Sequence, residues 1–243
     1  MKHIIILVLS SFLLSSCATT PDNQDPFMKF NRKIHAFNHD VDRMFLKPIA
    51  ETYKAITPQP IDKGISNFFN NLDEVSVVVN DVLQMKLEQA ASDTGRFVVN
   101  STVGLLGFVD VATGWGLPKH NEDFGQTLGY WGVSSGPYLV LPFLGPATIR
   151  DAGGRVVDSF TDPRTYASYA RDDEIKRAIL KANIIDIVDT RADLMELEKV
   201  VDAAAIDNYT FMRDAYLQRR EYLVYDGNPP REELDGDFLF DDE

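Results

Sequence analysis

The chain has 243 residues, a formal net charge of −13 and a single cysteine. This length allows one good-sized domain or two small ones. The acidic balance excludes a strongly basic nucleic-acid-binding surface, and the single cysteine excludes an intramolecular disulfide.

The first residues have the layout of a secretory signal. Lys2 precedes an apolar run at residues 4–14, which is too short and too close to the start to be a membrane-spanning helix. The following Leu14-Ser15-Ser16-Cys17 has the form of a bacterial lipobox, an aliphatic residue and two small residues before cysteine. We therefore predict a lipoprotein signal peptide at residues 1–16 and a lipidated tether at residues 17–25.

Lipidation of Cys17 would fix the mature chain to a membrane. Several acyl chains, palmitate among them, anchor firmly because each buried methylene contributes about 0.8 kcal/mol. Ala18 follows the cysteine, at a position where aspartate would favour retention at the inner membrane. By analogy with lipoproteins of Gram-negative bacteria, the absence of aspartate favours the outer membrane.

The mature chain begins with a predicted helix. Its apolar residues recur at spacings of three and four, which places on one stripe Phe27, Phe30, Ile34, Phe37, Val41 and Phe45. Asp25 and Pro26 have the pattern of an N-cap followed by proline at the first helical position. Three further helices are predicted at residues 61–72, 74–85 and 89–100.

Two segments in the middle of the chain carry almost no charge. Residues 97–118 contain only Asp110, and residues 124–149 contain no charged side chain. Five glycines and three prolines in the second segment prevent a regular helix, and irregular backbone in hydrocarbon leaves amide groups unsatisfied. We expect short helices and loops, packed by protein on one side and able to meet lipid or a partner on the other.

A long apolar helical face is predicted near the C-terminus. It comprises Leu180, Ile184, Ile187, Leu194, Leu197 and Val201. Arg191 interrupts this face and has two interpretations. It is either a half-buried arginine paired with Asp189 or Glu198, or a polar spot that lines a cavity or channel together with Lys181.

The chain ends with one more predicted helix, at residues 207–223, and an acidic tail at residues 227–243. Such charged termini are usually disordered. No run alternates between apolar and polar residues for long enough to form a sheet core. The predicted fold class is therefore all-α, with a single helical domain at residues 26–226.

No catalytic or metal-binding constellation emerges. Residues 132–136 match the G-x-S-x-G pattern of serine hydrolases, but that motif needs a strand before the serine and a helix after it. The histidine of such a device should follow Ser134, and the last histidine is His120. His35 and His39 have metal-competent spacing, but residue 36 is alanine where a zinc hydrolase needs glutamate. We predict no enzymatic activity, no metal and no cofactor.

Several segments together resemble one family. The residues are DPFMKFNRKIHAFN (25–38), LLGFVDVA (105–112), EDFGQTLGYWGVSSGPYLVLPFLGPATIRDAGG (122–154), VDTRADL (188–194) and RDAYLQRR (213–220). They are similar to the MlaA (VacJ) lipoprotein family over residues 25–225. The resemblance implies a ring- or disc-like helical domain in the periplasmic leaflet of a Gram-negative outer membrane, with a central, partly polar channel.

The resemblance also implies a function and partners. Phospholipid misplaced in the outer leaflet would pass through the channel to the periplasmic carrier MlaC, maintaining outer-membrane lipid asymmetry, and trimeric porins would be companions. An alternative is a non-enzymatic lipoprotein adaptor that binds a porin or another envelope partner. A path for lipid needs polar footing for the head and apolar walls for the tails.

The resemblance places the channel border at a hairpin over residues 103–124. The expected lipid-contacting residues are Leu105, Leu106, Phe108, Trp115 and Phe124, with Lys181 and Arg191 as polar channel groups. Phe37 and Asn38 fall in the first-helix motif, packed near the ring.

Overall fold

The structure is a computed structural model that describes residues 25–230. The predicted signal peptide, Cys17, most of the tether, and the acidic tail beyond residue 230 lie outside the described residues. Within residues 25–230, no helix combines the length and the apolar character needed to cross a membrane.

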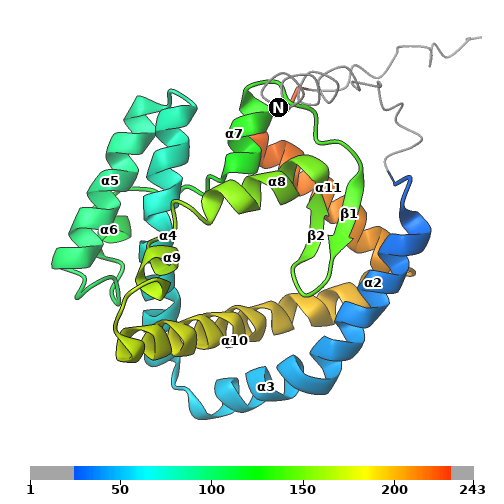
Figure 1. Cartoon of the computed structure of the whole chain (residues 1–243), viewed down its shortest axis with the longest axis horizontal. Coiled ribbons are helices and arrows are strands. Elements are labelled where there is room, and N and C mark those ends of the chain that lie inside the picture. The colour runs from blue at the N-terminus through cyan, green and yellow to red at the C-terminus, as the bar shows by residue number, and fades with distance from the viewer. Residues whose placement is uncertain (1–24, 231–243) are drawn as a thin grey trace, which may run out of the picture.

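The elements close into a ring around a central opening (Figure 1). In this view the opening is bordered by α4 (Gln59–Leu83), α8 (Ile149–Asp158), α9 (Pro163–Ser168), α10 (Asp173–Ala204) and a hairpin of β1 (Tyr138–Leu141) and β2 (Gly145–Thr148). The remaining elements lie outside or behind this border: α2 (Met28–Val41), η2 (Asp42–Leu46), α3 (Lys47–Ile56), α5 (Leu87–Thr102), α6 (Val111–Gly114), α7 (Phe124–Tyr130) and α11 (Asn208–Val224). The prediction of a mostly helical domain is confirmed, and the short hairpin is the exception to it.

The first helix is present, but its predicted start is wrong. It begins at Met28 and not at an Asp25 cap. The Asp25 carboxylate instead accepts hydrogen bonds from Asn31 of α2 and from the Tyr209 hydroxyl of α11, so it ties the two ends of the ring together. The helix continues through the π-helical turn η2 into α3, whose second residue is Pro48.

The predicted break between residues 72 and 74 does not exist. Helix α4 runs without interruption over 25 residues. Asp73 lies within it, and its carboxylate pairs at 2.8 Å with Arg164 of α9. Helix α5 packs beside α4 and is slightly longer than the predicted 89–100. The salt bridge between Asp73 and Arg164 thus links α4 to α9.

The uncharged run forms α7, the hairpin and the residues that join them. The strands pair antiparallel with Tyr138 opposite Thr148 and Leu141 opposite Gly145. Proline is acceptable here because a two-stranded sheet consists only of edge strands. Residues 142–144 make the turn, in which Phe143 has a φ of 63°. The expectation of short helices and loops therefore missed this hairpin.

The side chains buried within the wall of the ring are mostly polar. The largest fully buried side chains are Arg96, Tyr138, Gln84, Glu74, Asn31, Asn80, Thr127, Thr148, Asp81 and Asp93. They bond to one another and to the backbone: Arg96 donates to Glu74 at 3.1 Å and to the Leu117 carbonyl at 2.6 Å. The apolar cluster is small, with Tyr138, Val140 and Tyr209 at its centre.

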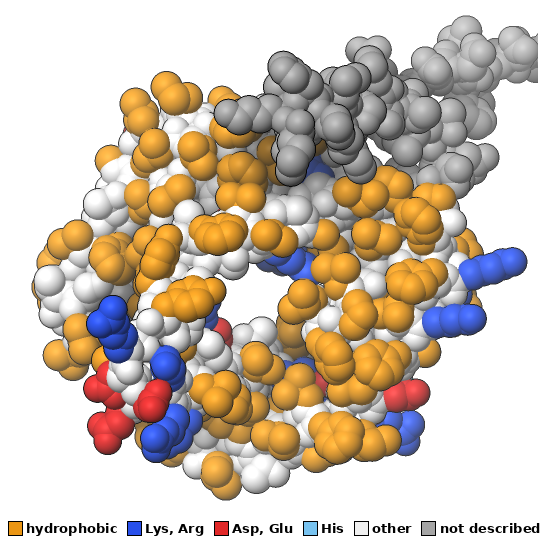
Figure 2. All heavy atoms as spheres, viewed as in Figure 1, with side chains coloured by type: hydrophobic (Ala, Val, Ile, Leu, Met, Phe, Trp, Pro, Cys, Tyr) orange, Lys and Arg blue, Asp and Glu red, His pale blue; other side chains and the backbone are white. Residues whose placement is uncertain are grey.

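Large apolar side chains lie on the outside instead. They are exposed on α2, η2, α3, α5, the loops and α10, as with Phe30, Phe45, Ile56, Leu105, Phe143 and Leu197. Figure 2 shows them spread over most of the visible face of the ring, around the opening and out to its rim. Soluble proteins rarely expose contiguous apolar surface on this scale, which marks a site of contact with a membrane or a partner.

Candidate functional site

A cavity of about 460 Å³ lies where α2, the hairpin, α10 and α11 meet. Its walls are partly apolar and partly polar, and they are formed by His35, Asn38, His39, Asp42, Tyr138, Val140, Gly145, Pro146, Arg191, Leu194, Leu197, Glu198, Val201, Asn208 and Met212. The volume lies in the range of small-molecule sites. The predicted apolar face of residues 180–201 contributes one wall through its last three members.

Arg191 is the polar centre of this cavity. Its Nε donates to Asp42 Oδ1 at 2.7 Å and its Nη2 to Asp42 Oδ2 at 2.9 Å, a bidentate pair. The same Nη2 donates to Glu198 at 2.6 Å, and Glu198 also pairs with Lys47 at 3.0 Å. Four charges from α3, α10 and η2 thus form one neutral network.

Both interpretations of Arg191 are therefore partly met by the structure. It is a paired arginine and it also lines a cavity, with Glu198 as one predicted partner. Asp189, the other predicted partner, instead accepts hydrogen bonds from Tyr53 and Ser66. Lys181 is exposed on the same helix and is not part of the cavity wall. The main partner, Asp42, was not predicted, because it lies far away in the sequence.

The charge network shifts the pKa values of Arg191 and Glu198. The side-chain hydrogen bond from Arg191 to Asp42 outweighs burial and raises the pKa of the guanidinium. Burial acts to raise the pKa of Glu198, but the hydrogen bonds from Arg191 and Lys47 are stronger together and hold that pKa below its usual range. Arg191 and Glu198 therefore both stay charged near neutral pH.

Two asparagines of α2 hold the hairpin against this cavity. Asn31 donates to the Tyr138 carbonyl and accepts from the Val140 amide, both at 3.0 Å. Asn38, two turns further along, donates to the Leu141 carbonyl and accepts from the Phe143 amide, both at 2.9 Å. The outer edge of β1 would otherwise present unpaired backbone groups, so the side-chain amides replace a neighbouring strand.

Phe37 also acts on the hairpin, as the neighbour of Asn38. Its ring meets Phe143 edge-on, with centroids 5.4 Å apart. The first-helix motif was predicted to pack near the ring, and the structure places it on the hairpin turn. Asn31 was missed, although its spacing of seven residues from Asn38 puts the two side chains on one face of the helix.

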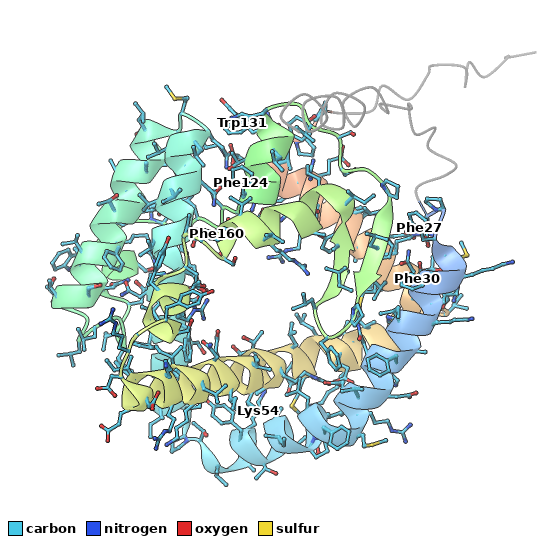
Figure 3. All side chains as sticks on the ribbon, in the orientation of Figure 1. Phe27, Phe30, Lys54, Phe124, Trp131 and Phe160 are labelled. Carbon is cyan, nitrogen blue, oxygen red and sulfur yellow. The ribbon has the colours of Figure 1, made fainter. Side chains whose placement is uncertain are left out.

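Side chains do not fill the central opening. Figure 2 shows a passage through the middle of the ring, with apolar side chains around most of its border and charged side chains at several points within it. Phe160, which follows α8, stands at the edge of the opening in Figure 3, whereas Phe27 and Phe30 lie at the N-terminal end of α2, away from the opening.

The predicted hairpin at residues 103–124 is in a different place from the cavity. Figure 1 shows α5 and α6 on the outer side of α4, away from the opening. Leu105, Leu106, Phe108 and Trp115 are exposed there, and only Phe108 stacks on a neighbour, Phe68 of α4, at 5.1 Å. The structure does not bring these side chains together with Arg191 or Lys181. Their contact with lipid stays a prediction.

The backbone of this loop is strained at its tip, at residues 105–107. Leu105 and Leu106 have φ values of 55° and 61°, and Gly107 has 95°. Left-handed backbone at a residue other than glycine costs roughly 1–2 kcal/mol. Both leucines are 69% exposed, so burial of their side chains does not compensate for the strain, and an observed outlier of this kind is a pointer to function.

Phe124, Ser134 and the two histidines of α2 lie in different parts of the fold. Phe124 is half-buried at the start of α7, with its ring against Trp131 at 6.0 Å. Ser134 lies in an exposed loop after helix α7 and before strand β1, the reverse of the strand–serine–helix order of a hydrolase. His35 and His39 both line the cavity. Among the described side chains, those of residues 25–201 and 205–230, no group of three or more histidine, cysteine or acidic residues is placed to hold a metal ion.

Comparisons with known proteins agree on one family. A family model described as MlaA lipoprotein matches residues 23–223. The chain is 34% identical over 246 aligned positions to the intermembrane phospholipid transport system lipoprotein MlaA of Escherichia coli (strain K12), covering 97% of this chain and 94% of that protein. The protein of the same name from Haemophilus influenzae is 30% identical over 258 positions, covering 98% and 97%.

A solved structure is also similar. It is described by the words "Structural basis for maintenance of bacterial outer membrane lipid asymmetry" and superimposes with a TM-score of 0.70 at 31% identity, covering 82% of this chain and 98% of that one. The matches in sequence and in structure span the ring and its cavity. The chain belongs to the MlaA lipoprotein family.

Proposed function

We propose that this chain is an outer-membrane lipoprotein that removes misplaced phospholipid from the outer leaflet and passes it, intact, to a periplasmic carrier. The relatives from Escherichia coli and Haemophilus influenzae are named as lipoproteins of an intermembrane phospholipid transport system. The observation that carries the proposal is the inverted distribution of side chains, with a bonded polar interior, an apolar exterior and an opening through the middle.

Elementary physics connects this distribution to a lipid leaflet. In hydrocarbon every polar group needs an internal partner. Most buried polar side chains of the ring have one, as Arg96 and Asn31 do, and the exceptions include one carboxylate oxygen each of Glu74 and Asp81. Apolar side chains gain nothing by facing inward when the surroundings are themselves apolar. The ring therefore suits insertion into one leaflet, with an acylated Cys17 as its anchor.

The transfer of an intact lipid requires a path of mixed polarity and no covalent chemistry. The cavity offers apolar walls through Leu194, Leu197 and Met212, and polar footing through Arg191 and Asp42. No bond is made or broken when a phospholipid changes leaflet, so a catalytic residue is not needed. Lipid asymmetry itself supplies a downhill direction.

The partners follow from the same account. A soluble carrier, MlaC in the family, would receive lipid at the periplasmic side, and a trimeric porin would hold the ring through part of its exposed apolar surface. The strained tip at Leu105 and Leu106 is proposed to contact lipid beside α4. Aspartate at Leu105 or Phe108 should therefore impair lipid removal without detaching the chain from the membrane.

The test uses cells that lack the protein and are complemented with variants. Surface-exposed phospholipid is measured by the access of an added phospholipase to intact cells. Leu197→Trp fills the cavity and should leave exposed phospholipid at the level of the empty strain. Leu180→Trp is the matched control, because Leu180 lies on the same helix, is equally exposed (61% against 62%) and lies outside the cavity.

The adaptor alternative predicts a different pattern. If the chain only binds an envelope partner, Leu197→Trp will complement as fully as Leu180→Trp, provided that both variants reach the membrane in equal amounts. That result would overturn transport through the cavity.

A further inference from the structure

A second hollow of about 400 Å³ adjoins the cavity on the side of η2 and α3. All but one of its lining residues have ionisable side chains: His39, Asp42, Arg43, Lys47, Pro48, Glu51 and Glu198. Three of these residues, His39, Asp42 and Glu198, also line the cavity with apolar walls. The two hollows therefore share a wall, one side largely apolar and the other charged.

Most charges in this second hollow neutralise one another. Asp42 pairs with Arg191, and Glu198 pairs with both Arg191 and Lys47. Among the side chains that the structure describes (residues 25–201 and 205–230), Arg43 and Glu51 form no salt bridge with each other or with any other residue. One cation and one anion thus remain available at a site whose other charges are balanced.

The local backbone explains how the two hollows obtain different side chains. Residues Asp42–Leu46 form a π-helical turn between two α-helices, and such turns are frequent at functional sites. Asp42 faces both hollows, whereas Arg43 lines only the polar one. Lys47 and Glu51 follow at intervals of four residues and line that same hollow.

We infer that the polar hollow binds a zwitterionic headgroup in which a phosphate carries an ammonium. The phosphate would pair with Arg43, beside His39 and Lys47, and the ammonium would pair with Glu51. The acyl chains would lie toward the apolar walls of the adjoining cavity. An anionic lipid without the ammonium would satisfy Arg43 but leave Glu51 facing a second negative charge. This inference rests on the proposed function, because it assigns the headgroup class that the same cavity selects.

The experiment measures which lipid the purified full-length lipoprotein retains. Protein in detergent is mixed with equal amounts of phosphatidylethanolamine and phosphatidylglycerol that carry the same acyl chains, and bound lipid is counted by native mass spectrometry. We expect about threefold more phosphatidylethanolamine than phosphatidylglycerol, the ratio that one exposed ion pair provides. Glu51→Lys should bring the ratio to one or below, and Arg43→Gln should lower the retention of both lipids.

Two controls accompany these variants. Glu221→Lys makes the same charge change on α11, at an exposed position outside both hollows, and should leave the ratio unchanged. Glycerophosphoethanolamine, the same headgroup without acyl chains, should not displace the bound lipid at equal concentration. Displacement would indicate a site for a free headgroup and would overturn the inference.

The outcomes separate the inference from the proposed function. If the wild type retains neither lipid, the proposed function itself fails. If it retains both lipids equally, or if Glu51→Lys leaves the ratio at its wild-type value, headgroup selection fails while transport of phospholipid stands. All variants are compared by circular dichroism, and Arg43 and Glu51 are exposed, so the fold should survive both changes.

Discussion

Replacing Arg191 by methionine should destabilise the ring at the junction of η2 and α10. The change removes the bidentate pair to Asp42 and the hydrogen bond to Glu198. The arginine side chain is only 11% exposed, and the two carboxylates are 24% exposed. Breaking a buried ion pair costs roughly 3–5 kcal/mol. Water reaches these carboxylates in part, and Glu198 keeps Lys47, so we expect a loss of about 2–3 kcal/mol in the free energy of unfolding.

Thermal unfolding in detergent, followed by circular dichroism, measures this loss. For a domain of this size, 1 kcal/mol lowers Tm by about 2–4 °C, so Arg191→Met should lower Tm by roughly 5–10 °C. A double-mutant cycle with Asp42→Asn should give a coupling energy of about 2 kcal/mol. The control is Lys199→Met, which removes an exposed pair with Glu196 on the same helix and should change stability by less than about 0.5 kcal/mol.

The cycle can also refute the reasoning. A coupling energy below about 0.5 kcal/mol would make Arg191–Asp42 an ordinary surface pair. The charge network would then not organise the cavity wall, and Arg191 and Asp42, the polar groups proposed to contact the lipid headgroup, would have no fixed geometry.

Three further predictions concern the hairpin, the polar interior and the strained loop. Asn31→Ala leaves two buried backbone groups of β1 unpaired and should lower the free energy of unfolding by about 3 kcal/mol, whereas Asn38→Ala, at a half-buried site, should lower it by about 1 kcal/mol. Faster hydrogen exchange at the Val140 amide should accompany the larger loss and should occur in Asn31→Ala alone. Equal losses in the two variants would contradict the proposal that these amides replace a neighbouring strand. Burial, and next the adjacent Asp93 carboxylate, raises the pKa of Asp81 to about 7. The folded chain therefore binds more protons than the unfolded chain between about pH 4 and pH 7, so stability should fall as pH rises through that window, and a decline equally steep in Asp81→Asn would exclude Asp81 as its source. Leu106→Asn should raise stability by about 1 kcal/mol in unfolding measurements, because asparagine tolerates left-handed backbone; unchanged or lower stability would show that the loop is not strained.

Helical periodicity could be read from the sequence, but the direction of the apolar faces could not. The stripe that begins at Phe27 predicts α2 well, yet Phe27, Phe30 and Phe37 are exposed while Asn31 is buried between them. The spacing of residues depends only on the helix, whereas the side that faces inward depends on the surroundings. When those surroundings are lipid, the usual assignment of the apolar stripe to the core is inverted.

The hairpin and the continuity of α4 also could not be predicted from the sequence. Four-residue strands are too short to show a clear alternation, and β1 depends for its outer hydrogen bonds on Asn31 and Asn38, more than 100 residues away. The predicted break between residues 72 and 74 was wrong: Asp73 lies within α4, and its partner Arg164 is remote in the sequence. Local patterns therefore predicted most helices, and long-range polar contacts decided the rest.

The same reasoning applies to the site. Arg191 could be singled out from the sequence as a charge on an apolar face, and Glu198 as a partner seven residues on. Asp42 could not, because the pair joins segments that only the closed ring brings together. The family resemblance directed attention to residues 103–124, and the structure adds a cavity on the opposite side of the opening, at α2 and α10.

Photo-crosslinking in living cells tests the central claim most directly. A photoreactive amino acid is placed at position 197, inside the cavity, and at position 180, on the same helix outside it. The account predicts that position 197 captures intact phospholipid well above the level at position 180. Capture of protein alone at position 197, with no phospholipid attached, would contradict the passage of lipid through this ring.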